Sequence, residues 1–126
     1  MDVQIIAGSK SDQNIVEKVE SVLKGRVDYG VEYCSFHREP ERLDGIVKKS
    51  KAKLFVCIAG LSAALPGAVA AMTDKPVIGV PVSAKLGGVD ALLSIAQMPR
   101  GVPVACVGID SGENAGLLAL RILGKK

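Results

Sequence analysis

The sequence contains few aromatic residues: they make up only 3% of its 126 residues, and tryptophan is absent. Proteins that bind single-stranded nucleic acid stack the bases on aromatic side chains, so this scarcity argues against that function. Hydrophobic residues still make up 48% of the chain. We therefore expect a single domain over residues 1–126, with a core of valine, isoleucine, leucine and alanine.

A strong net charge and long apolar runs are also missing. The net charge is +3 and the basic residues are scattered, which argues against binding to duplex nucleic acid. No basic segment followed by a long apolar run opens the chain. Glycine and proline interrupt the apolar stretches before any reaches the length of a membrane span. We expect neither a signal peptide nor a membrane partner.

Metal-binding groups are equally scarce. There is one histidine, the carboxylates do not group, and Cys34, Cys57 and Cys106 lack the CxxC spacing of metal and redox sites. We predict no bound metal, and buried, reduced thiols in a cytoplasmic protein. The glycine-rich loop that ends in Gly-Lys-Ser or Gly-Lys-Thr is absent, which argues against hydrolysis of nucleoside triphosphates.

Short apolar runs alternate with segments of helical periodicity. The runs predict strands at 3–7, 31–34, 54–59, 77–80 and 103–109. The other segments predict helices at 15–23, 40–47, 61–72, 91–97 and 115–122. This alternation is typical of an α/β fold with a parallel five-stranded sheet, for which 2-1-3-4-5 is a common strand order.

The segment 61–72 has almost no charge on any face. A helix that is apolar all round is normally buried on all sides, and a domain of this size has little room to bury one alone. We therefore expect this helix to pack against its equivalents in other subunits of a homo-oligomer.

The loops after the first three strands carry the most distinctive residues. In an open parallel sheet of order 2-1-3-4-5, ligands bind beyond the carboxyl ends of the strands, between strands 1 and 3. The segments 8–12, 35–40 and 60–67, the last opened by Gly60, follow these strands. We expect all three loops to converge on one crevice.

The second loop holds His37, the only histidine of the chain, beside Arg38. An imidazole exchanges protons near neutral pH, so His37 is a candidate general acid and base. The alternatives are that His37 is a plain surface residue, or that it activates Cys34 as a nucleophile.

The first loop, Gly8-Ser9-Lys10-Ser11-Asp12, suits a phosphate. Ser9 and Ser11 offer hydroxyl donors, the helix that follows offers free N–H groups, and Arg38 can add a charge-assisted fork. Asp12 would repel a phosphate and more naturally accepts hydrogen bonds from ribose hydroxyls. Ser11 or Asp12 as a simple helix cap is the alternative. Together these groups predict a small phosphorylated ribose compound as substrate.

Five motifs together resemble the N5-carboxyaminoimidazole ribonucleotide mutase (PurE) family of purine biosynthesis. The motifs begin at Gly8, Ser35, Ala63, Lys75 and Gln97, and they read GSKSD, SxHRxP, AxLPG, KPVIGVPV and QMPRGVPV. The match runs in order over nearly the whole chain.

The resemblance implies a flavodoxin-like domain in an octamer, with no metal and no organic cofactor. The apolar segment 61–72 by itself predicts a tetramer or an octamer. It implies that Ser9, Asp12 and Arg38 hold the ribonucleotide, with Ser35 nearby, and that His37 is the general acid and base. In the family's reaction the carboxylate leaves N5 as carbon dioxide and is captured by C4 of the imidazole ring.

Three departures from the family pattern stand out. Ala64 occupies the position of a usual loop histidine, and Phe36 and Glu39 replace alanine and threonine. We also expect a domain 1–126 that lacks the family's usual C-terminal helical extension. Two other functions therefore stay open. One is a related carboxylase that uses free carbon dioxide or bicarbonate, on aminoimidazole ribonucleotide or another nucleotide. The other is a non-catalytic nucleotide-binding paralogue.

Overall fold

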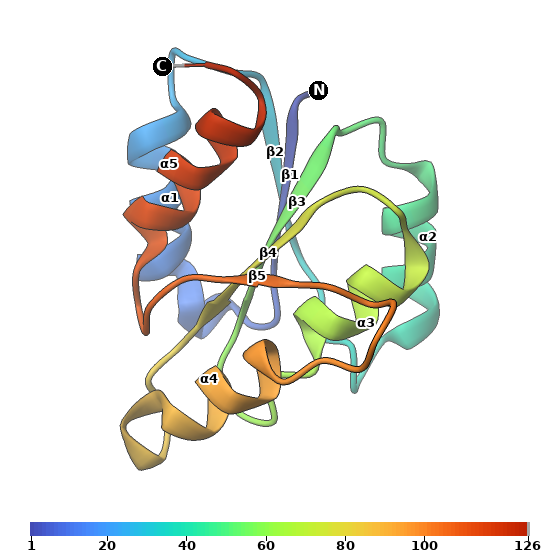
Figure 1. Cartoon of the computed structure of the whole chain (residues 1–126), viewed down its shortest axis with the longest axis vertical. Helices are drawn as coiled ribbons and strands as arrows, with labels where there is room; N and C mark the ends of the chain where they lie inside the picture. The colour runs from blue at the N-terminus through green and yellow to red at the C-terminus, as the bar shows by residue number, and fades with distance from the viewer. Residues whose placement is uncertain (126) are drawn as a thin grey trace.

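The computed structural model describes residues 1–125 and contains one parallel sheet between two helical layers (Figure 1). The strands are β1 (Val3–Ala7), β2 (Tyr29–Tyr33), β3 (Leu54–Ala59), β4 (Val77–Pro81) and β5 (Ala105–Cys106). Their order is β2-β1-β3-β4-β5, and all neighbouring pairs are parallel. The predicted α/β flavodoxin-like fold is therefore confirmed.

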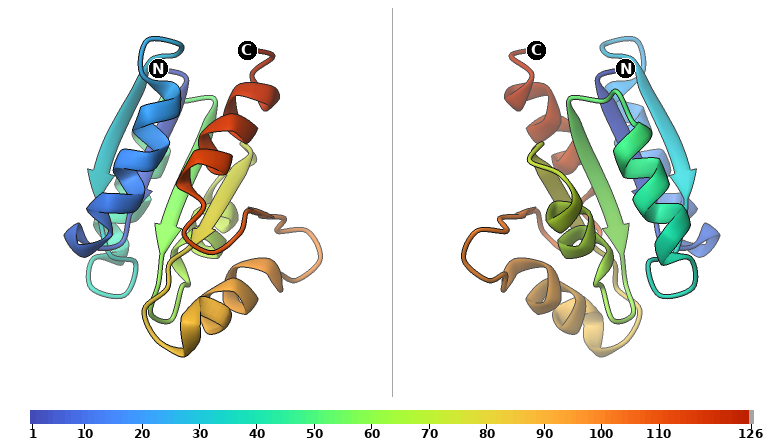
Figure 2. Two further views of the ribbon diagram at one scale, coloured as in Figure 1. Left: turned by 90° about the vertical axis from the view of Figure 1, so that its left-hand side faces the viewer. Right: turned by 90° about the vertical axis from the view of Figure 1, so that its right-hand side faces the viewer.

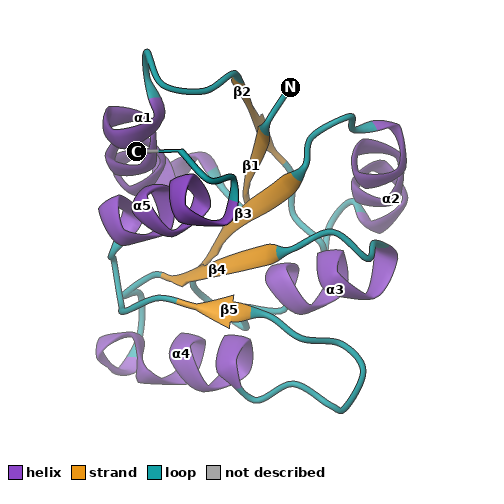
Figure 3. Cartoon of the chain, turned by 45° about the horizontal axis from the view of Figure 1, so that its top comes forward, coloured by secondary structure: helices purple, strands orange, loops and turns teal. Residues whose placement is uncertain are grey.

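The helices are α1 (Gln13–Leu23), α2 (Pro40–Lys49), α3 (Leu65–Met72), α4 (Val89–Ala96) and α5 (Gly112–Ile122). Helices α1 and α5 cover one face of the sheet, and α2 and α3 cover the other, with α4 beside β5 (Figure 3). Two short 3-10 helices, Lys10–Asp12 and Leu86–Gly88, precede α1 and α4.

The alternation of side chains along each strand builds two separate cores. On β1, Ile5 belongs to the core under α1 and α5, while Ile6 belongs to the core under α2, α3 and α4. On β3, Val56 and Phe55 divide in the same way. Both faces of these two strands are therefore buried, which is why β3 is an unbroken hydrophobic run and β1 is interrupted only by Gln4, whose amide donates to the carbonyl of Gly30.

Glycines allow α1 and α5 to lie side by side, as the left view of Figure 2 shows. A Cβ atom added at Gly112 would lie 2.7 Å from the carbonyl oxygen of Ile15. One added at Gly116 would lie 2.8 Å from Cβ of Val22. This close packing fixes α1, whose N-terminal end faces the loops described below.

Eight of the ten predicted elements have different bounds in the structure, and three of these differences alter the loops between elements. The second strand is Tyr29–Tyr33 instead of 31–34, so that Cys34 lies just beyond it. The fifth strand is reduced from 103–109 to Ala105–Cys106. The third helix begins at Leu65 instead of residue 61, because Ser62 has a left-handed backbone (φ 56°) and Pro66 favours the first turn of a helix.

The apolar helix α3 is only partly available to a partner. Leu65, Pro66 and Val69 are buried against the protein's own sheet and neighbouring helices, whereas Ala71 is exposed. One face of this helix is therefore covered within its own chain, and the expected packing against other subunits can involve only its other face. Within residues 1–125, none of the helices is long and apolar enough to cross a membrane.

Candidate active site

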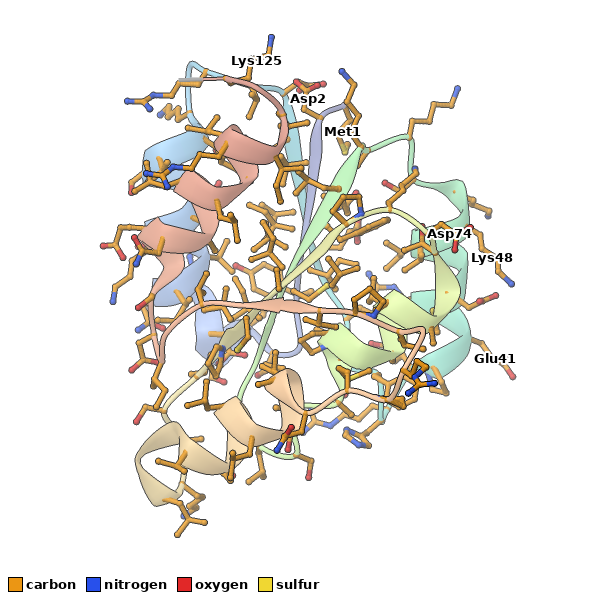
Figure 4. The ribbon with its side chains drawn as sticks, viewed as in Figure 1. Met1, Asp2, Glu41, Lys48, Asp74 and Lys125 are labelled. Carbon is orange, nitrogen blue, oxygen red and sulfur yellow. The ribbon has the colours of Figure 1, made fainter. Side chains whose placement is uncertain are left out.

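A pocket of about 370 Å³ lies at the carboxyl ends of β1, β2 and β3. It lies at the opposite end of the molecule from Met1, Asp2 and Lys125, which are labelled in Figure 4. The three predicted loops form most of its wall, and the loop after β4 adds one residue. Its lining residues are Gly8, Ser9, Ser11, Asp12, Ser35, Phe36, His37, Arg38, Ala59, Gly60, Leu61, Ser62, Ala64, Leu65 and Ala84. The predicted convergence of the loops is present in the structure.

The first loop presents two hydroxyl groups to the pocket. Ser9 has an extended backbone, and its Oγ accepts hydrogen bonds from the N–H of Ser11 (3.2 Å) and from the Ser11 hydroxyl (2.9 Å). Ser9 therefore caps the short 3-10 helix that leads into α1. This arrangement holds both hydroxyls at the pocket wall beside the N-terminal end of a helix, where an anion is favoured.

Asp12 is buried in this wall, with only 8% of its surface exposed. It occupies the N-cap position of α1, yet its side chain makes no capping hydrogen bond. The interpretation of Asp12 as a simple helix cap is therefore wrong. Burial raises the pKa of the Asp12 carboxyl, and the nearby carboxylate of Asp110 raises it further. Asp12 thus offers its carboxylate oxygens to a ligand in the pocket.

This raised pKa predicts that the ionised Asp12 carboxylate lowers the free energy of unfolding at neutral pH. A carboxyl whose pKa is higher in the folded state does not lower the free energy of unfolding below its unfolded-state pKa of about 3.9, where it is protonated in both states. As the pH rises from there through the folded-state pKa, the free energy of unfolding falls. We therefore expect Asp12→Asn to increase the free energy of unfolding at pH 7 and to have little effect near pH 3.5, as measured by urea denaturation across this range.

The same variant should weaken ribonucleotide binding by about tenfold, because an amide has one acceptor oxygen where the carboxylate has two charged ones. Asp74→Asn is the matched control, since Asp74 is exposed and lies outside the pocket. An Asp12→Asn protein that is less stable than the parent at pH 7 would show that the carboxylate supports the fold.

The second loop is a turn that presents His37 and Arg38. The Ser35 hydroxyl accepts a hydrogen bond from the N–H of Arg38 (3.2 Å), and the N–H of Glu39 donates to the Ser35 carbonyl (2.9 Å). Ser35 therefore shapes the turn as well as lining the pocket. Both His37 and Arg38 are exposed to solvent at the pocket. Within residues 1–125 the Arg38 guanidinium has no ion pair and no hydrogen bond, so its donors are free for an anion.

Phe36 and Arg42 hold this turn in place. The ring of Phe36 packs partly into the core and meets the His37 ring edge to face, with centroids 5.5 Å apart. Phe36 therefore both packs behind the strand end and restricts the imidazole. Arg42 donates to the carbonyl of Tyr33 (2.8 Å) and pairs with Glu32 (3.1 Å) and Glu39 (3.5 Å), which ties β2 to α2. Glu39 thus stabilises the turn through its ion pair with Arg42.

Cys34 is not part of the site. Its side chain is buried, does not line the pocket, and its thiol donates to the carbonyl of Glu39 (3.8 Å). Burial raises the pKa of this thiol and of the Cys57 and Cys106 thiols. A cysteine–histidine nucleophile is therefore contradicted.

The third loop supplies an apolar wall. A Cβ atom added at Gly60 would lie 3.4 Å from Cβ of Val82 and 3.5 Å from Cβ of Ala84, which are ordinary contact distances, so the loops after β3 and β4 lie against each other here. Ala64 lines the pocket where the family pattern has a histidine. Apart from the Ser62 hydroxyl, the lining side chains that can exchange protons or bind anions come from the first two loops.

The arrangement can bind an anion and move a proton. Arg38 and the hydroxyls of Ser9 and Ser11 suit a phosphate, Asp12 suits ribose hydroxyls, and His37 can donate or accept a proton. Among residues 1–125, no three histidine, cysteine, aspartate or glutamate side chains are grouped as they are in a metal site. Leu61, Ser62 and Ala84 also line the pocket; the first two belong to the predicted loop 60–67, whereas Ala84 lies outside the three predicted loops. Small and apolar side chains carry no chemical signal that could have identified Leu61 and Ala84.

Comparison with known proteins identifies the family. The family model for AIR carboxylase matches residues 2–126. The chain belongs to the AIR carboxylase family. The resemblance drawn from the five motifs is thereby confirmed.

Members of this family with assigned names are similar over almost the whole chain. The N5-carboxyaminoimidazole ribonucleotide mutase of Methanocaldococcus jannaschii is 59% identical over 126 residues, which cover 97% of this chain and 78% of that protein. The phosphoribosylaminoimidazole carboxylase of Saccharomyces cerevisiae is 49% identical over 97% of this chain and 22% of its own length. The crystal structure of Treponema denticola PurE superposes with a TM-score of 0.87 at 35% identity, covering 97% of this chain and 79% of that one.

Proposed function

We propose that this protein is an N5-carboxyaminoimidazole ribonucleotide mutase of purine biosynthesis. The observation that supports this most directly is the meeting of His37, Arg38, Ser9 and Asp12 in one pocket, in a chain 59% identical to a protein named for this activity. The substrate is a ribonucleotide with one phosphate, one ribose and one imidazole ring, and each part has a partner of suitable chemistry in the pocket.

The substrate is oriented by the first two loops. Arg38 and the hydroxyls of Ser9 and Ser11 bind the phosphate, and Asp12 accepts hydrogen bonds from the ribose hydroxyls. Ser35 holds the turn that carries Arg38 (3.2 Å from its Oγ to the Arg38 nitrogen). Gly60 and the apolar third loop close the side on which carbon dioxide is held.

His37 moves one proton twice. The protonated imidazole gives its proton to N5 as the N5–carboxylate bond breaks and carbon dioxide is released inside the pocket. C4 then attacks the carbon dioxide, which forms the new carbon–carbon bond and leaves an extra proton on C4. The neutral imidazole removes that proton, so the histidine ends in its starting state and no external acid or base is consumed.

The related carboxylase function is the second candidate. It is favoured by the yeast relative named phosphoribosylaminoimidazole carboxylase and by Ala64, which replaces a polar residue of the family pattern. The two functions differ in the source of the carboxylate. A mutase transfers the substrate's own carboxylate, whereas a carboxylase takes carbon dioxide from solution.

One assay distinguishes these functions. Purified protein is given N5-carboxyaminoimidazole ribonucleotide in ¹³C-bicarbonate, and separately aminoimidazole ribonucleotide with the same bicarbonate, both without ATP. A mutase forms unlabelled product from the first substrate only, whereas a carboxylase forms labelled product from the second. If neither substrate is converted but both bind, the protein is a non-catalytic nucleotide-binding paralogue and the proposal is wrong.

We further propose that the protein works in the cytoplasm as a homo-oligomer. Free thiols such as the buried Cys34 and Cys57 suit a reducing compartment. Exposed apolar side chains gather on the 3-10 helix before α4 and on α4 itself: Leu86 is 79% exposed, Val89 51% and Leu93 53%. Together with the open face of α3, they form the kind of surface that soluble monomers rarely expose.

Sedimentation should therefore give a mass several times that of the chain, for a tetramer or an octamer. Leu93→Lys and Ala71→Lys should each lower this mass or precipitate the protein, because a desolvated charge would be repeated about a symmetry axis. Val69 is unsuitable for this test because it is buried within its own chain. Ser21→Lys, on the exposed side of α1, is the control and should leave the mass unchanged. A stable, active monomer would contradict the oligomer.

A further inference from the structure

Asp110, which follows β5, connects three parts of the fold. Its backbone is left-handed (φ 59°), and its N–H donates to the carbonyl of Pro81 (2.8 Å). Its carbonyl accepts from Nζ of Lys18 in α1 (3.2 Å) and from the N–H of Gly112 (3.0 Å). Its carboxylate Oδ1 accepts from the N–H of Ser83 (2.9 Å). The side chain therefore reaches across from the β5–α5 loop to the loop after β4.

The segment held by Asp110 reaches the pocket. Ser83 is followed by Ala84, which lines the pocket beside Gly60. The backbone then passes through three left-handed residues, Leu86 (φ 49°), Gly87 (φ 64°) and Gly88 (φ 87°). The position of Ala84 in this segment between β4 and α4 thus depends on the hydrogen bond that holds Ser83.

A second contact fixes the far end of this segment beside the same loop. A Cβ atom added at Gly88 would lie 2.7 Å from Cγ2 of Ile109 and 3.2 Å from Cα of Ser83. Residues 109–110 therefore meet both ends of the segment 83–88. The contact at Ile109 is packing, whereas the contact at Asp110 is a charge-assisted hydrogen bond.

Asp110 also acts on Asp12 through its charge. Burial and the Asp110 carboxylate together raise the pKa of Asp12. Tyr33, at the end of β2, lies near enough to the Asp12 carboxylate to be affected by its charge, and His37 and Arg38 line the same pocket.

We propose that Asp110 is a positioning residue of the site: its carboxylate anchors Ser83 and thereby holds the Ala84 wall against the pocket. The effect on catalysis rests on the proposed function, whereas the anchoring of the segment does not. The sequence alone does not indicate this positioning role. Asp110 lies 98 positions from Asp12, and it lies outside the three loops that carry the acid–base and anion-binding side chains.

Three substitutions separate the hydrogen bond from the backbone strain and from the charge. Asp110→Asn keeps an acceptor oxygen but loses the charge, Asp110→Ala loses both, and Asp110→Gly loses both while removing the strain of the left-handed backbone. In the free protein, hydrogen–deuterium exchange of the peptide 82–89 should become faster in the alanine and glycine variants and stay at the parental rate in the asparagine variant.

In assays with N5-carboxyaminoimidazole ribonucleotide, the alanine and glycine variants should have a KM about tenfold above the parental value and a kcat within about twofold of it. The reason is the loss of the charge-assisted hydrogen bond from Ser83 to Asp110, which positions Ala84. The asparagine variant should recover the parental KM. In the parent, 1/KM should decrease at low pH as the Asp12 carboxylate becomes protonated. In all three variants this decrease should occur at a lower pH, because removing the neighbouring charge of Asp110 lowers the pKa of Asp12.

An alanine variant with the parental exchange rate and the parental KM would overturn the proposal. A glycine variant that behaves like the parent would also overturn it, because backbone strain at residue 110 would then explain the result for alanine. If the parent protein does not turn over the substrate, the proposed function fails. Calorimetric titration with aminoimidazole ribonucleotide then replaces KM, and the same pattern of affinities is expected.

Discussion

Replacing His37 with asparagine should reduce turnover of N5-carboxyaminoimidazole ribonucleotide by at least about 10²-fold, which is the usual effect of removing a general acid or base. Asparagine keeps a similar size and polarity but cannot exchange a proton near neutral pH. The affinity for ribonucleotide should change little, because Arg38, Ser9 and Asp12 are all retained. Steady-state kinetics with calorimetric titration of aminoimidazole ribonucleotide would measure both effects.

No other group in the pocket is placed to substitute for His37. Arg38 does not release its proton in proteins, Asp12 lies in the wall of the first loop, and the Cys34 thiol is buried and hydrogen-bonded to Glu39. The chain has one histidine, so no second imidazole can take over the proton transfer. A variant that turns over at the parental rate would leave His37 as a loop residue and remove the proposed mechanism.

The sheet and its order could be predicted because the physical signal was strong. Strands covered on both faces are mostly apolar, and Val3–Ala7 and Leu54–Ala59 are buried at every position with Gln4 as their one polar residue. Parallel strands then require crossovers of one hand, which leaves few possible topologies. The positions of three loops at one end of the sheet followed from these two facts alone.

Element ends were harder to predict because they depend on single backbone angles. The apolar run 103–109 resembles a full strand, yet only Ala105–Cys106 pairs with β4. Pro103 has no N–H to donate, and Asp110 turns the chain with a left-handed backbone. The helical composition of 61–72 likewise concealed the left-handed Ser62, which makes residues 61–64 a pocket-lining turn instead of a helix.

The site was predicted where side chains carry chemistry and missed where they do not. His37, Arg38 and Asp12 were found because imidazole, guanidinium and carboxylate groups have few structural reasons to meet at strand ends. Ala84 contributes only shape, and Asp110 acts through the backbone of Ser83. Their contribution depends on which loops become neighbours, and that is known only once the chain is folded.

Replacing Arg38 with alanine should weaken the binding of aminoimidazole ribonucleotide by at most about 3 kcal/mol, and barely change the binding of the unphosphorylated nucleoside. Arg38 is exposed, so solvent screening favours the lower part of this range, about tenfold in affinity. Its guanidinium is free of ion pairs within residues 1–125, so its removal leaves no carboxylate unpaired. Calorimetric titration with the two ligands would measure the difference.

Arg38→Lys separates charge from geometry. Lysine keeps the positive charge but cannot form the two parallel hydrogen bonds of a guanidinium, so its affinity for the ribonucleotide should fall between those of the parent and the alanine variant. Arg26→Ala, in the exposed turn after α1, is the matched control and should bind both ligands as the parent does. The turn itself should survive in all variants, because its hydrogen bond to Ser35 uses the backbone N–H of residue 38 and not the side chain. An equal loss of affinity for nucleotide and nucleoside would therefore assign Arg38 to supporting the turn, and the phosphate would have to be bound by Ser9, Ser11 and the end of α1 alone.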